Sequence, residues 1–427
     1  MKAVMLLAGD STRMRPLTYT KPKPLLQVAG KTILQHNLEQ LKKSGIRDVI
    51  LVVGYLQDKI KNFLKNNSFG MNLKFVSQEQ RMGTGHALLQ AKDMIKDETF
   101  LVMCGDDIYH SDDIKKCLKS GLCLLANEKE NPENFASVEV EKGFVKNIIE
   151  KPKNPDSKLT NTGLYVMNKD IFNFLEDVKK SPRDEFEVTD AVFKMCGKHP
   201  VKCVIAGKWV PIGYPWDLLI ANEMLMKEIV SNVPAAEKNV MMKGSVSVGK
   251  NTIIKSGAYI EGPVIIGSNC TIGPNCFIRV NSVIGNGCRI GNAVEVKNTI
   301  IGDNTKIEHL SYVGDSVIGD NCNLAAGTII ANLRHDNKSI RLNVKGQMVD
   351  TGRRKFGVVM GDYTKTGIKT SIYPGIMMGP FSWTSPGFVA KENVKPLTLD
   401  GSKFLSESKF DSNLAGEISF VKEAISK

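Results

Sequence analysis

Two groups of residues in this sequence have the types and spacing that chemistry on an anion requires. The first lies in LLAGDSTRMRPLT, residues 6–18, where an apolar run breaks at Gly9 and two arginines, Arg13 and Arg15, follow in one short turn. Ligands of a parallel α/β sheet sit at the carboxyl ends of its strands, so this turn predicts an anion site, with phosphate the first choice. A solvated basic loop is the alternative interpretation.

The second group lies on a repeat of six residues. The aliphatic residues of this repeat are Val248, Ile254, Ile260, Ile266, Ile272, Ile278, Ile284, Ile290 and Val296, followed after one slip by Ile301, Ile307 and Val313 and after another by Ile318, Leu324 and Ile330. A step of six indicates a parallel β-helix, in which each hexapeptide makes one flat side and three sides complete a coil. Small residues two places earlier fit inward positions: Ala258, Cys270, Cys276, Cys288 and Cys322. A weaker continuation runs through Met360, Thr366, Ile372 and Met378.

This repeat predicts where the polar residues point. Three sides separate Ile290 from Ile307, so Asn292 and His309 should lie one above the other on adjacent coils, about 4.8 Å apart in backbone height. Four further side chains should point outward and Asn332 should sit at a corner; the four are Arg279, Lys297, Tyr312 and Asn323. A histidine among such side chains is a plausible general base for an anionic substrate.

The elements that position these residues change type along the chain. From residue 1 to about 230, apolar runs such as AVMLLAG and RDVILVVG alternate with helical patterns such as ILQHNLEQLKKSG, which Gly45 closes. This alternation predicts an α/β domain with a mostly parallel sheet and helices on both faces. We therefore expect a first domain over 1–230, a linker around Pro234 over 231–244, a β-helix over 245–395 and a tail with helical potential over 396–427.

Composition excludes several classes of protein. The 427 residues are 42% hydrophobic and 24% charged, and no stretch approaches a membrane span or a cleavable leader, so the cytoplasm is the expected location. The nine cysteines form no CxxC pair, which argues against a zinc site or a disulfide framework. The net charge of +12 is spread without basic tracts, which favours small phosphorylated ligands over nucleic acid.

The stretch IEHLSYVGDSVIGDNCNLAAGTIIANLRHD, residues 307–336, resembles the acetyltransferase segment of the prokaryotic bifunctional enzymes that make UDP-N-acetylglucosamine. The resemblance implies a left-handed β-helix that assembles as a trimer, or as a dimer of trimers, with sites between subunits. His309 would take a proton from the amino group of glucosamine 1-phosphate as it attacks acetyl-CoA. The sugar phosphate would be held by Arg279 and Lys297. The sugar or the acetyl donor would be oriented by Tyr312, Asn323, Asn332 and Lys338. The TGRRKFG segment resembles a subgroup in which one amino-sugar site accepts more than one epimer.

The opening LLAGDSTRMRPLTYTKPKPLL is similar to the signature of sugar-1-phosphate nucleotidylyltransferases, with a Rossmann-like fold. The resemblance implies attack of a sugar phosphate on the α-phosphorus of UTP or dTTP, with Arg13 and Lys23 neutralising the triphosphate and Gly9 allowing close approach. In SQEQRMGTGHA, the base-reading positions are Gln78, Gly83 and Thr84. Asp106 matches a Mg²⁺ ligand, and Glu150, Lys151 and Asn161 match sugar-contacting positions.

Three residues depart from that family's pattern. Ser11 stands where the phosphate-binding turn usually has a second glycine, and Ala136 replaces a glycine expected beside the sugar. Pro211, in KWVPIGYPW, stands where the pattern has the other Mg²⁺-binding aspartate, and Asp217 lies six residues too far along to replace it. The first domain is therefore expected to be a weakened or metal-shifted nucleotidylyltransferase, or a binding domain whose transferase chemistry has faded.

The main hypothesis is a bifunctional enzyme that acetylates glucosamine 1-phosphate with acetyl-CoA and couples the product to UTP with Mg²⁺, with galactosamine 1-phosphate as an alternative amino-sugar substrate. One alternative is a glucose-1-phosphate thymidylyltransferase or uridylyltransferase that uses the β-helix for assembly. Another is a regulatory subunit with a degenerate metal site. The partners expected are small molecules and further copies of the chain, without nucleic acid or membrane.

Overall fold

The computed structural model describes residues 1–233 and 236–426, so Pro234 of the expected linker lies outside the described residues. The chain forms two compact units. The first comprises residues 1–10, 22–25 and 32–211, and the second comprises residues 11–21, 26–31 and 212–427. The second unit thus contains most of the basic turn that carries Arg13, in addition to the hexapeptide repeat.

The first unit is built on one mixed sheet, with strands in the order β5-β4-β1-β6-β10-β7-β11-β9-β8. Its strands are β1 (Ala3–Leu7), β4 (Asp48–Val53), β5 (Asn72–Ser77), β6 (Thr99–Cys104), β7 (Cys123–Glu128), β8 (Ala136–Glu141), β9 (Phe144–Glu150), β10 (Leu159–Asn168) and β11 (Lys202–Ile205). The prediction of a mostly parallel sheet holds only for part of it. The strands β5, β4, β1 and β6 are parallel, whereas β10 runs antiparallel to both β6 and β7, and β9 runs antiparallel to β8.

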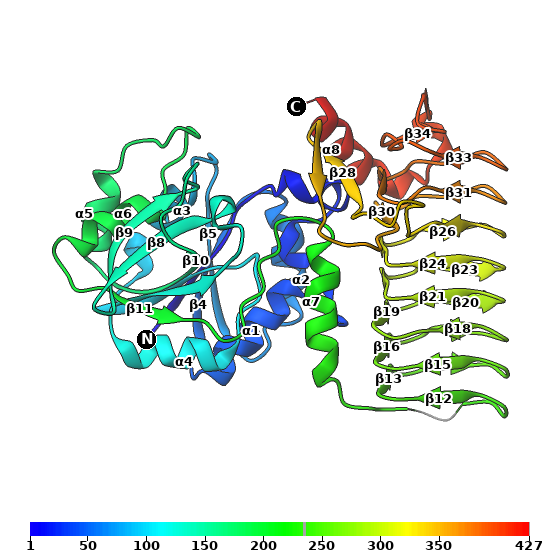
Figure 1. Cartoon of the computed structure of the whole chain (residues 1–427), viewed down its shortest axis with the longest axis horizontal. Coiled ribbons are helices and arrows are strands. Elements are labelled where there is room, and N and C mark those ends of the chain that lie inside the picture. Colours follow the sequence, from blue (N-terminus) through cyan, green and yellow to red (C-terminus); the bar gives the residue numbers. More distant parts are fainter. Residues whose placement is uncertain (234–235, 427) are drawn as a thin grey trace. The chain divides into compact units, whose positions relative to one another are not determined.

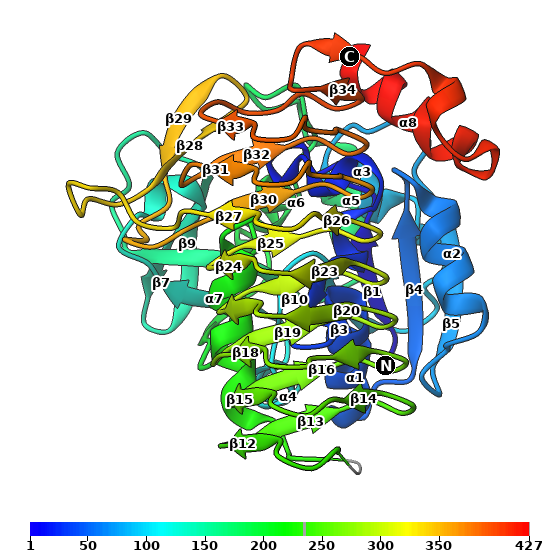
Figure 2. The ribbon, with the colours of Figure 1, turned by 90° about the vertical axis from the view of Figure 1, so that its right-hand side faces the viewer.

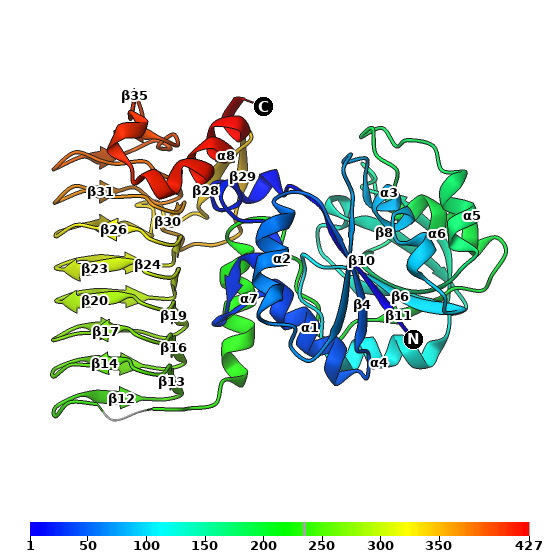
Figure 3. The same cartoon turned by 180° about the vertical axis from the view of Figure 1, so that it is seen from behind.

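Helices cover both faces of this sheet (Figure 3). They are α1 (Ile33–Lys43), α2 (Gln57–Lys65), α3 (Thr84–Leu89), α4 (Ser111–Ser120), α5 (Ile171–Glu176) and α6 (Val188–Cys196). Alternate residues of β1 enter opposite cores: Val4 packs with α3, α5 and α6, and Met5 packs with α1, α2 and α4. Gly45 follows the end of α1 with φ 89°, as the sequence predicts, and the Thr32 side chain caps its start by accepting from the Gln35 amide.

The hexapeptide region forms three stacks of short parallel strands (Figures 1 and 2). The first stack is β12 (Met241–Lys243), β15 (Tyr259–Glu261), β18 (Phe277–Ile278), β21 (Glu295–Lys297), β24 (Tyr312–Gly314), β27 (Ile329–Ile330), β31 (Ser371–Ile372) and β33 (Val389–Ala390). The second is β13 (Val246–Val248), β16 (Val264–Ile266), β19 (Ser282–Ile284), β22 (Ile300–Ile301), β25 (Val317–Ile318), β30 (Val358–Met360) and β32 (Ile376–Met378). The third is β14 (Ile253–Ile254), β17 (Thr271–Ile272), β20 (Arg289–Asn292), β23 (Lys306–His309) and β26 (Asn323–Leu324). The helix therefore begins at β12, inside the stretch expected to be a linker.

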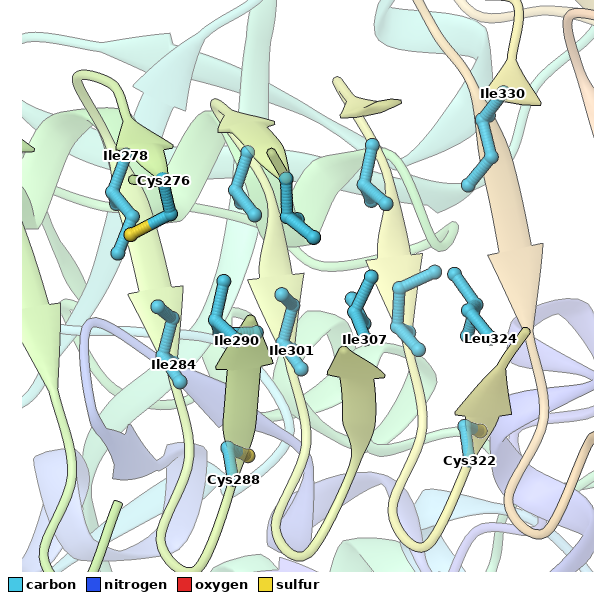
Figure 4. Close-up of a cluster of buried hydrophobic side chains, with 14 of the residues drawn as sticks. Cys276, Ile278, Ile284, Cys288, Ile290, Ile301, Ile307, Cys322, Leu324 and Ile330 are labelled. Atoms are coloured by element: carbon cyan, nitrogen blue, oxygen red, sulfur yellow. The ribbon is translucent and has the colours of Figure 1, made fainter. Parts of the chain in front are cut away.

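The predicted inward residues form one continuous core (Figure 4). Every aliphatic position of the repeat from Val248 to Ile330 is at most 3% exposed, and Cys276, Cys288 and Cys322 lie in the same core. Equivalent residues are 18 positions apart in the first coils and 17 apart after the predicted slip, as between Asn286 and Asp303. The weaker continuation is confirmed, since Met360, Thr366, Ile372 and Met378 are all buried.

Asparagines make many of the corners between the stacks. Their φ angles are positive, in the left-handed region that asparagine tolerates better than most residues; they include Asn251, Asn269, Asn281, Asn298, Asn304 and Asn321. After β27 the chain leaves the coil, forms the hairpin β28 (Arg341–Val344) and β29 (Gln347–Asp350), and returns so that β30 pairs with β25.

The remaining elements of the second unit pack against these coils. Helix α7 (Asp217–Leu225) hydrogen-bonds to the segment at Ala29, because the Asn222 Oδ1 accepts from the Ala29 amide at 2.9 Å. The tail ends in α8 (Ala415–Ser426), as its helical pattern predicts; two short strands, β34 (Thr398–Leu399) and β35 (Lys403–Phe404), precede it. Within the described part of the chain, none of the helices combines the length and apolarity that crossing a membrane requires.

Candidate functional site

The first unit brings Lys23 and Asp106 together at the carboxyl end of β6. The Lys23 ammonium is nearly buried, and its Nζ lies 2.8 Å from Asp106 Oδ2 and 3.7 Å from Asp107 Oδ1. The Asp106 side chain is 40% exposed, so it remains open to a ligand. Gly9 lies at the end of β1, and among the described residues no atom outside its chain neighbours lies within 4 Å of where a Cβ would stand. The sequence predicts Asp106 as a metal ligand but does not predict its pairing with Lys23.

The base-reading residues form a second cluster. The Gln78 side chain donates to the Gly83 carbonyl at 3.1 Å and lies 2.9 Å from the His86 Nδ1, and burial lowers the pKa of His86. Gly83 has φ 97°, and a Cβ there would lie 2.5 Å from the Phe186 carbonyl oxygen. Only glycine fits both requirements, so Gly83 is more than a simple turn residue.

A charged segment around residues 183–189, which the sequence analysis missed, supports this cluster. The Phe186 carbonyl accepts from the Gly85 amide at 2.7 Å, and the Thr84 hydroxyl accepts from the Val188 amide at 3.1 Å. Arg183 is paired through Nη2 with the buried Glu187 at 2.7 Å. The contacts of Thr84 and Gly85 with this segment join parts of the chain that are far apart in sequence, so no local pattern indicates them.

The same segment reaches the sugar-contacting position Glu150. The Glu150 carboxylate lies 3.7 Å from the Arg183 guanidinium and accepts from the Thr189 hydroxyl at 3.5 Å. Burial and the Glu187 carboxylate raise the pKa of Glu150, whereas Arg183 lowers it. Ala136 pairs in register with Glu150, so its extra methyl group lies beside this position.

The other two sugar-contacting positions lie on separate elements. Lys151 follows β9 directly with φ 45°, and its amide donates to the Phe135 carbonyl at 3.1 Å. Asn161 lies at an irregularity of β10, where its Nδ2 donates to the Tyr165 hydroxyl at 2.5 Å and its Oδ1 accepts from the Gly163 amide. The Asn161 amide is therefore held by neighbours on its own strand.

The turn that carries Arg13 belongs to the second unit. The Arg13 guanidinium lies over the Tyr214 ring, 5.2 Å from its centroid, and Tyr214 stacks on Trp216 at 4.5 Å. This stack holds Arg13 by a cation–π contact that the sequence does not reveal. Ser11 has φ 49° and ψ 47°, the left-handed conformation that explains why a glycine is expected there.

Pro211 supplies no ligand, and its neighbours do not replace it. The Asp217 carboxylate accepts from the Gly213 and Tyr214 amides, both at 2.8 Å, so it stabilises the turn before α7. Among the described residues, no group of three or more histidine, cysteine, aspartate or glutamate side chains could hold a metal ion. The donor set near Asp106 fits only an ion with few protein ligands, which Mg²⁺ tolerates because it keeps several waters.

The β-helix residues fall into two groups on adjacent sides. Asn292 and His309 pair in register on β20 and β23, which confirms the prediction, and His309 is exposed. Asn323 is exposed on β26 of the same stack. The neighbouring stack carries the other expected residues, which lie on its strands or follow them: Arg279, Lys297, Tyr312 and Asn332. A corner at Leu310 and Ser311 separates the two groups, so one chain does not gather them all on one face.

The second group is organised by Asp315, which the sequence analysis missed. Its carboxylate is 3% exposed and accepts from Asn332 Nδ2 at 2.6 Å, from Lys297 Nζ at 3.3 Å and from Asn298 Nδ2 at 2.9 Å. Asn332 also lies 3.0 Å from the Tyr312 hydroxyl. One buried carboxylate thus contacts two of the expected substrate-contacting side chains, Lys297 and Asn332, and is linked through Asn332 to a third, Tyr312.

Besides the residues on the stack of His309, Arg279 and Lys338 also take no part in that network. Arg279 pairs with Glu295 at 2.8 Å, which leaves its side chain 37% exposed. Lys338 lies in the exposed loop after β27, where its backbone amide donates to Asp336 at 3.2 Å. From Asn298 the contacts continue to Glu223 of α7 at 3.0 Å, and Glu223 also pairs with Arg353 of the inserted segment at 2.5 Å.

Comparisons with known proteins span both units. A family model described as Nucleotidyl transferase matches residues 2–228, and one described as GMPPB C-terminal domain matches residues 260–372. The chain is 41% identical over 402 residues to a Methanocaldococcus jannaschii protein named Bifunctional protein GlmU, covering 93% of this chain and 97% of that protein. It is 37% identical over 408 residues to a Sulfurisphaera tokodaii protein named Bifunctional sugar-1-phosphate nucleotidylyltransferase/acetyltransferase, covering 92% and 98%. A Haloferax volcanii protein named Low-salt glycan biosynthesis nucleotidyltransferase Agl11 is 32% identical over 257 residues, covering 58% of this chain and 70% of that protein.

Proposed function

Since this chain belongs to the family of bifunctional GlmU proteins, we propose that it acetylates glucosamine 1-phosphate and transfers UMP from UTP to the product. The chain is a transferase, and its two activities correspond to the two groups of residues described above. The observation that carries the proposal is the extent of the match: relatives named as bifunctional align over more than nine-tenths of this chain and of their own length. An alignment of this extent includes the coils around His309, and the match to the nucleotidyl transferase family model, over residues 2–228, includes the Arg13 turn.

In the acetyl transfer, the amino nitrogen of glucosamine 1-phosphate attacks the thioester carbonyl of acetyl-CoA. The His309 imidazole accepts a proton from that nitrogen, a C–N bond forms, and the C–S bond breaks. The proton then passes to the leaving thiolate, so CoA departs as the thiol. Arg279 and Lys297 bind the sugar phosphate, and Tyr312, Asn332, Asn323 and Lys338 orient the reactants.

In the nucleotidyl transfer, a phosphate oxygen of N-acetylglucosamine 1-phosphate attacks the α-phosphorus of UTP and pyrophosphate leaves. Arg13 and Lys23 neutralise the triphosphate, and Gln78, Gly83 and Thr84 read the base. Glu150, Lys151 and Asn161 position the sugar. Asp106 would hold Mg²⁺, which, when bound, would withdraw negative charge from the phosphate oxygens.

This second activity is expected to be weakened or shifted toward another divalent metal ion. A site with Asp106 and without a carboxylate at position 211 has fewer protein ligands than the family pattern supplies. Loss of one carboxylate ligand lowers metal affinity rather than abolishing it, because water can occupy the vacated position. A complete loss of nucleotidyl transfer would instead favour a binding role for this half of the chain.

We also propose that the β-helix is left-handed and that three chains assemble around it. The division of the acetyl-transfer residues between two adjacent sides of one chain supports this assembly, because a neighbouring subunit would complete each site. The family resemblance supports both the handedness and the trimer.

The proposal is tested by incubating the full chain with glucosamine 1-phosphate, acetyl-CoA, UTP and Mg²⁺ and identifying the products by mass spectrometry. We expect N-acetylglucosamine 1-phosphate first and UDP-N-acetylglucosamine after it. Parallel reactions with dTTP and with galactosamine 1-phosphate define the base and the epimer. Absence of acetylated product would contradict the acetyltransferase assignment, whereas nucleotide-sugar formation without acetylation would favour the thymidylyltransferase or uridylyltransferase alternative.

A further inference from the structure

A column of corner residues in the β-helix carries more negative charge than its coils require. The column contains Asn286, Asp303, Asp320 and Asp362, one on each successive coil. Each side-chain oxygen accepts from a backbone amide of the preceding coil: the Ser268 amide bonds to Asn286, and the Asp320 amide bonds to Asp362 at 2.7 Å. Asn286 makes this contact without a charge, so the stacking alone does not explain why its equivalents are aspartates.

The negative charges at Asp320 and Asp362 face Lys21. The Lys21 ammonium pairs with Asp320 Oδ2 and lies 3.4 Å from Asp362 Oδ1. The neighbouring Thr20 hydroxyl donates to Asp362 Oδ2 at 2.7 Å. The Asp362 side chain is 5% exposed and the side chains of Lys21 and Asp320 are about one-fifth exposed. A half-buried charge cluster of this kind is sensitive to the loss of one partner.

The electrostatics of the cluster agree with this geometry. Burial lowers the pKa of Lys21, but the carboxylates of Asp362 and Asp320 more than offset that effect and raise it. Burial and the charge of Asp362 raise the pKa of Asp320 to about 6, although Lys21 opposes them. One lysine therefore lies between two crowded carboxylates and offsets part of their negative charge.

An apolar contact adjoins the ion cluster. Tyr19 packs against a core formed by Phe381, Leu397 and the α8 residues Ile418 and Val421. In Figure 3, α8 lies beside the dark-blue segment that contains Tyr19. Three consecutive residues, Tyr19 to Lys21, are thus bound to the last coils and the tail.

These three residues belong to the compact run that carries Arg13. The Thr18 hydroxyl donates to the Ser11 carbonyl at 3.0 Å, and the Met14 amide donates to the same carbonyl at 2.9 Å. Two short 3₁₀ turns, Thr12–Met14 and Leu17–Tyr19, complete the run. A displacement at Lys21 is therefore transmitted to Arg13 over one short, internally bonded segment.

We propose that Lys21, through Asp320 and Asp362, is a positioning residue for nucleotidyl transfer, which makes the last coils of the β-helix a support for the triphosphate-binding turn. This inference rests on the proposed function, because it concerns the same Arg13 turn. Its consequence is that a substitution on the β-helix, far along the chain from Arg13, impairs nucleotidyl transfer and spares acetyl transfer.

The test compares three variants of the full chain. Lys21→Met keeps the length of the side chain and removes its charge, and Asp362→Asn keeps the acceptor that stacks the coils, as Asn286 demonstrates. Asp303→Asn is the matched control, because it lies in the same column and makes the same type of backbone contact without an ion-pair contact to Lys21. Both activities are measured on each variant, with KM for UTP and kcat determined separately.

We expect Lys21→Met and Asp362→Asn to raise the KM for UTP at least tenfold, with acetyl transfer within twofold of the unchanged chain. Asp303→Asn should leave both activities within twofold, and Lys21→Arg should restore part of the lost UTP affinity. A KM for UTP within twofold of the original in both Lys21→Met and Asp362→Asn would overturn the proposal. A parallel loss of both activities would also overturn it, because it would mean that the cluster serves folding alone.

Hydrogen exchange of residues 11–21 tests the same inference without turnover. Lys21→Met should speed exchange of these amides at least tenfold, whereas Asp303→Asn should not change it. If the unchanged chain releases no pyrophosphate, the proposed nucleotidyl transfer is wrong. The positioning role of Lys21 is then decided by hydrogen exchange and by equilibrium binding of UTP. Unchanged exchange and unchanged UTP binding in Lys21→Met would overturn that role.

Discussion

The β-helix and the α/β unit place their functional residues by different means. In the β-helix, one register fixes every outward position, and the pairing of Asn292 with His309 follows from counting residues. In the α/β unit, the residues expected to bind nucleotide and sugar come from strand ends and loops that no common period relates. A periodic backbone therefore allows a site to be predicted from sequence, whereas contacts such as that between the Val188 amide and the Thr84 hydroxyl depend on how distant segments meet.

The largest expected effect is the loss of acetyl transfer, the activity proposed for the β-helix, without loss of nucleotidyl transfer. We predict that His309→Ala lowers the kcat of acetyl transfer by about 10²–10⁴-fold, the usual contribution of a general base. Thiol release from acetyl-CoA with glucosamine 1-phosphate measures it. Pyrophosphate release from UTP and the size of the assembly should not change, because His309 is exposed on an outward position. Acetyl transfer at the original rate would remove His309 from the mechanism.

The α/β unit offers a gain of activity instead. Pro211→Asp should restore a carboxylate ligand and raise pyrophosphate release at limiting Mg²⁺ by about tenfold or more, since each added carboxylate strengthens binding of a hard cation. The measurement is a Mg²⁺ titration of nucleotidyl transfer. Pro211→Ala is the control, because it frees the backbone without adding a ligand. Equal gains in both variants would mean that the proline ring, and not the missing carboxylate, limits the reaction.

The next prediction concerns the buried carboxylate that sequence reasoning missed in the periodic region. Asp315→Asn keeps an acceptor for Asn298 but removes the charge that faces Lys297 and Asn332. We expect the KM for glucosamine 1-phosphate to rise about tenfold, in line with the loss of a hydrogen bond to a charged group. Steady-state kinetics of both activities would reveal it. A fall in kcat at constant KM would instead indicate that Asp315 acts on the reacting groups.

The smallest expected effect lies in the Arg13 turn. Ser11→Gly removes a Cβ from a left-handed position and should lower the KM for UTP by about two- to fivefold, a change of the size that local backbone strain permits. Ser11→Ala keeps the Cβ and serves as the control. If the alanine variant improves UTP binding as much as the glycine variant, the hydroxyl group and not the backbone is responsible.

Much of the architecture could be predicted because its signals are local. The six-residue step, the capped helix α1 and the apolar runs of the first sheet each depend on neighbouring residues. The antiparallel placement of β10 could not be predicted, since an apolar strand carries no mark of the direction of its partner. The roles of Asp315 and Lys21 could not be predicted for a related reason: a charged residue in a turn or bend cannot be told from a solvated one until its partners are known.

The inserted segment after β27 shows how such a coil can acquire new parts. The Gly357 amide donates to the Asp315 carbonyl, and the Phe356 amide donates to the Asn332 carbonyl, so the chain returns beside the point where it left. After the insertion the stack resumes its register, because Ile318 pairs with Met360. The equivalent corners Asp320 and Asp362 are therefore 42 residues apart, instead of the 17 or 18 found elsewhere in the coil. An excursion that leaves the stacking undisturbed can change in length and sequence without any change in the coils on either side of it.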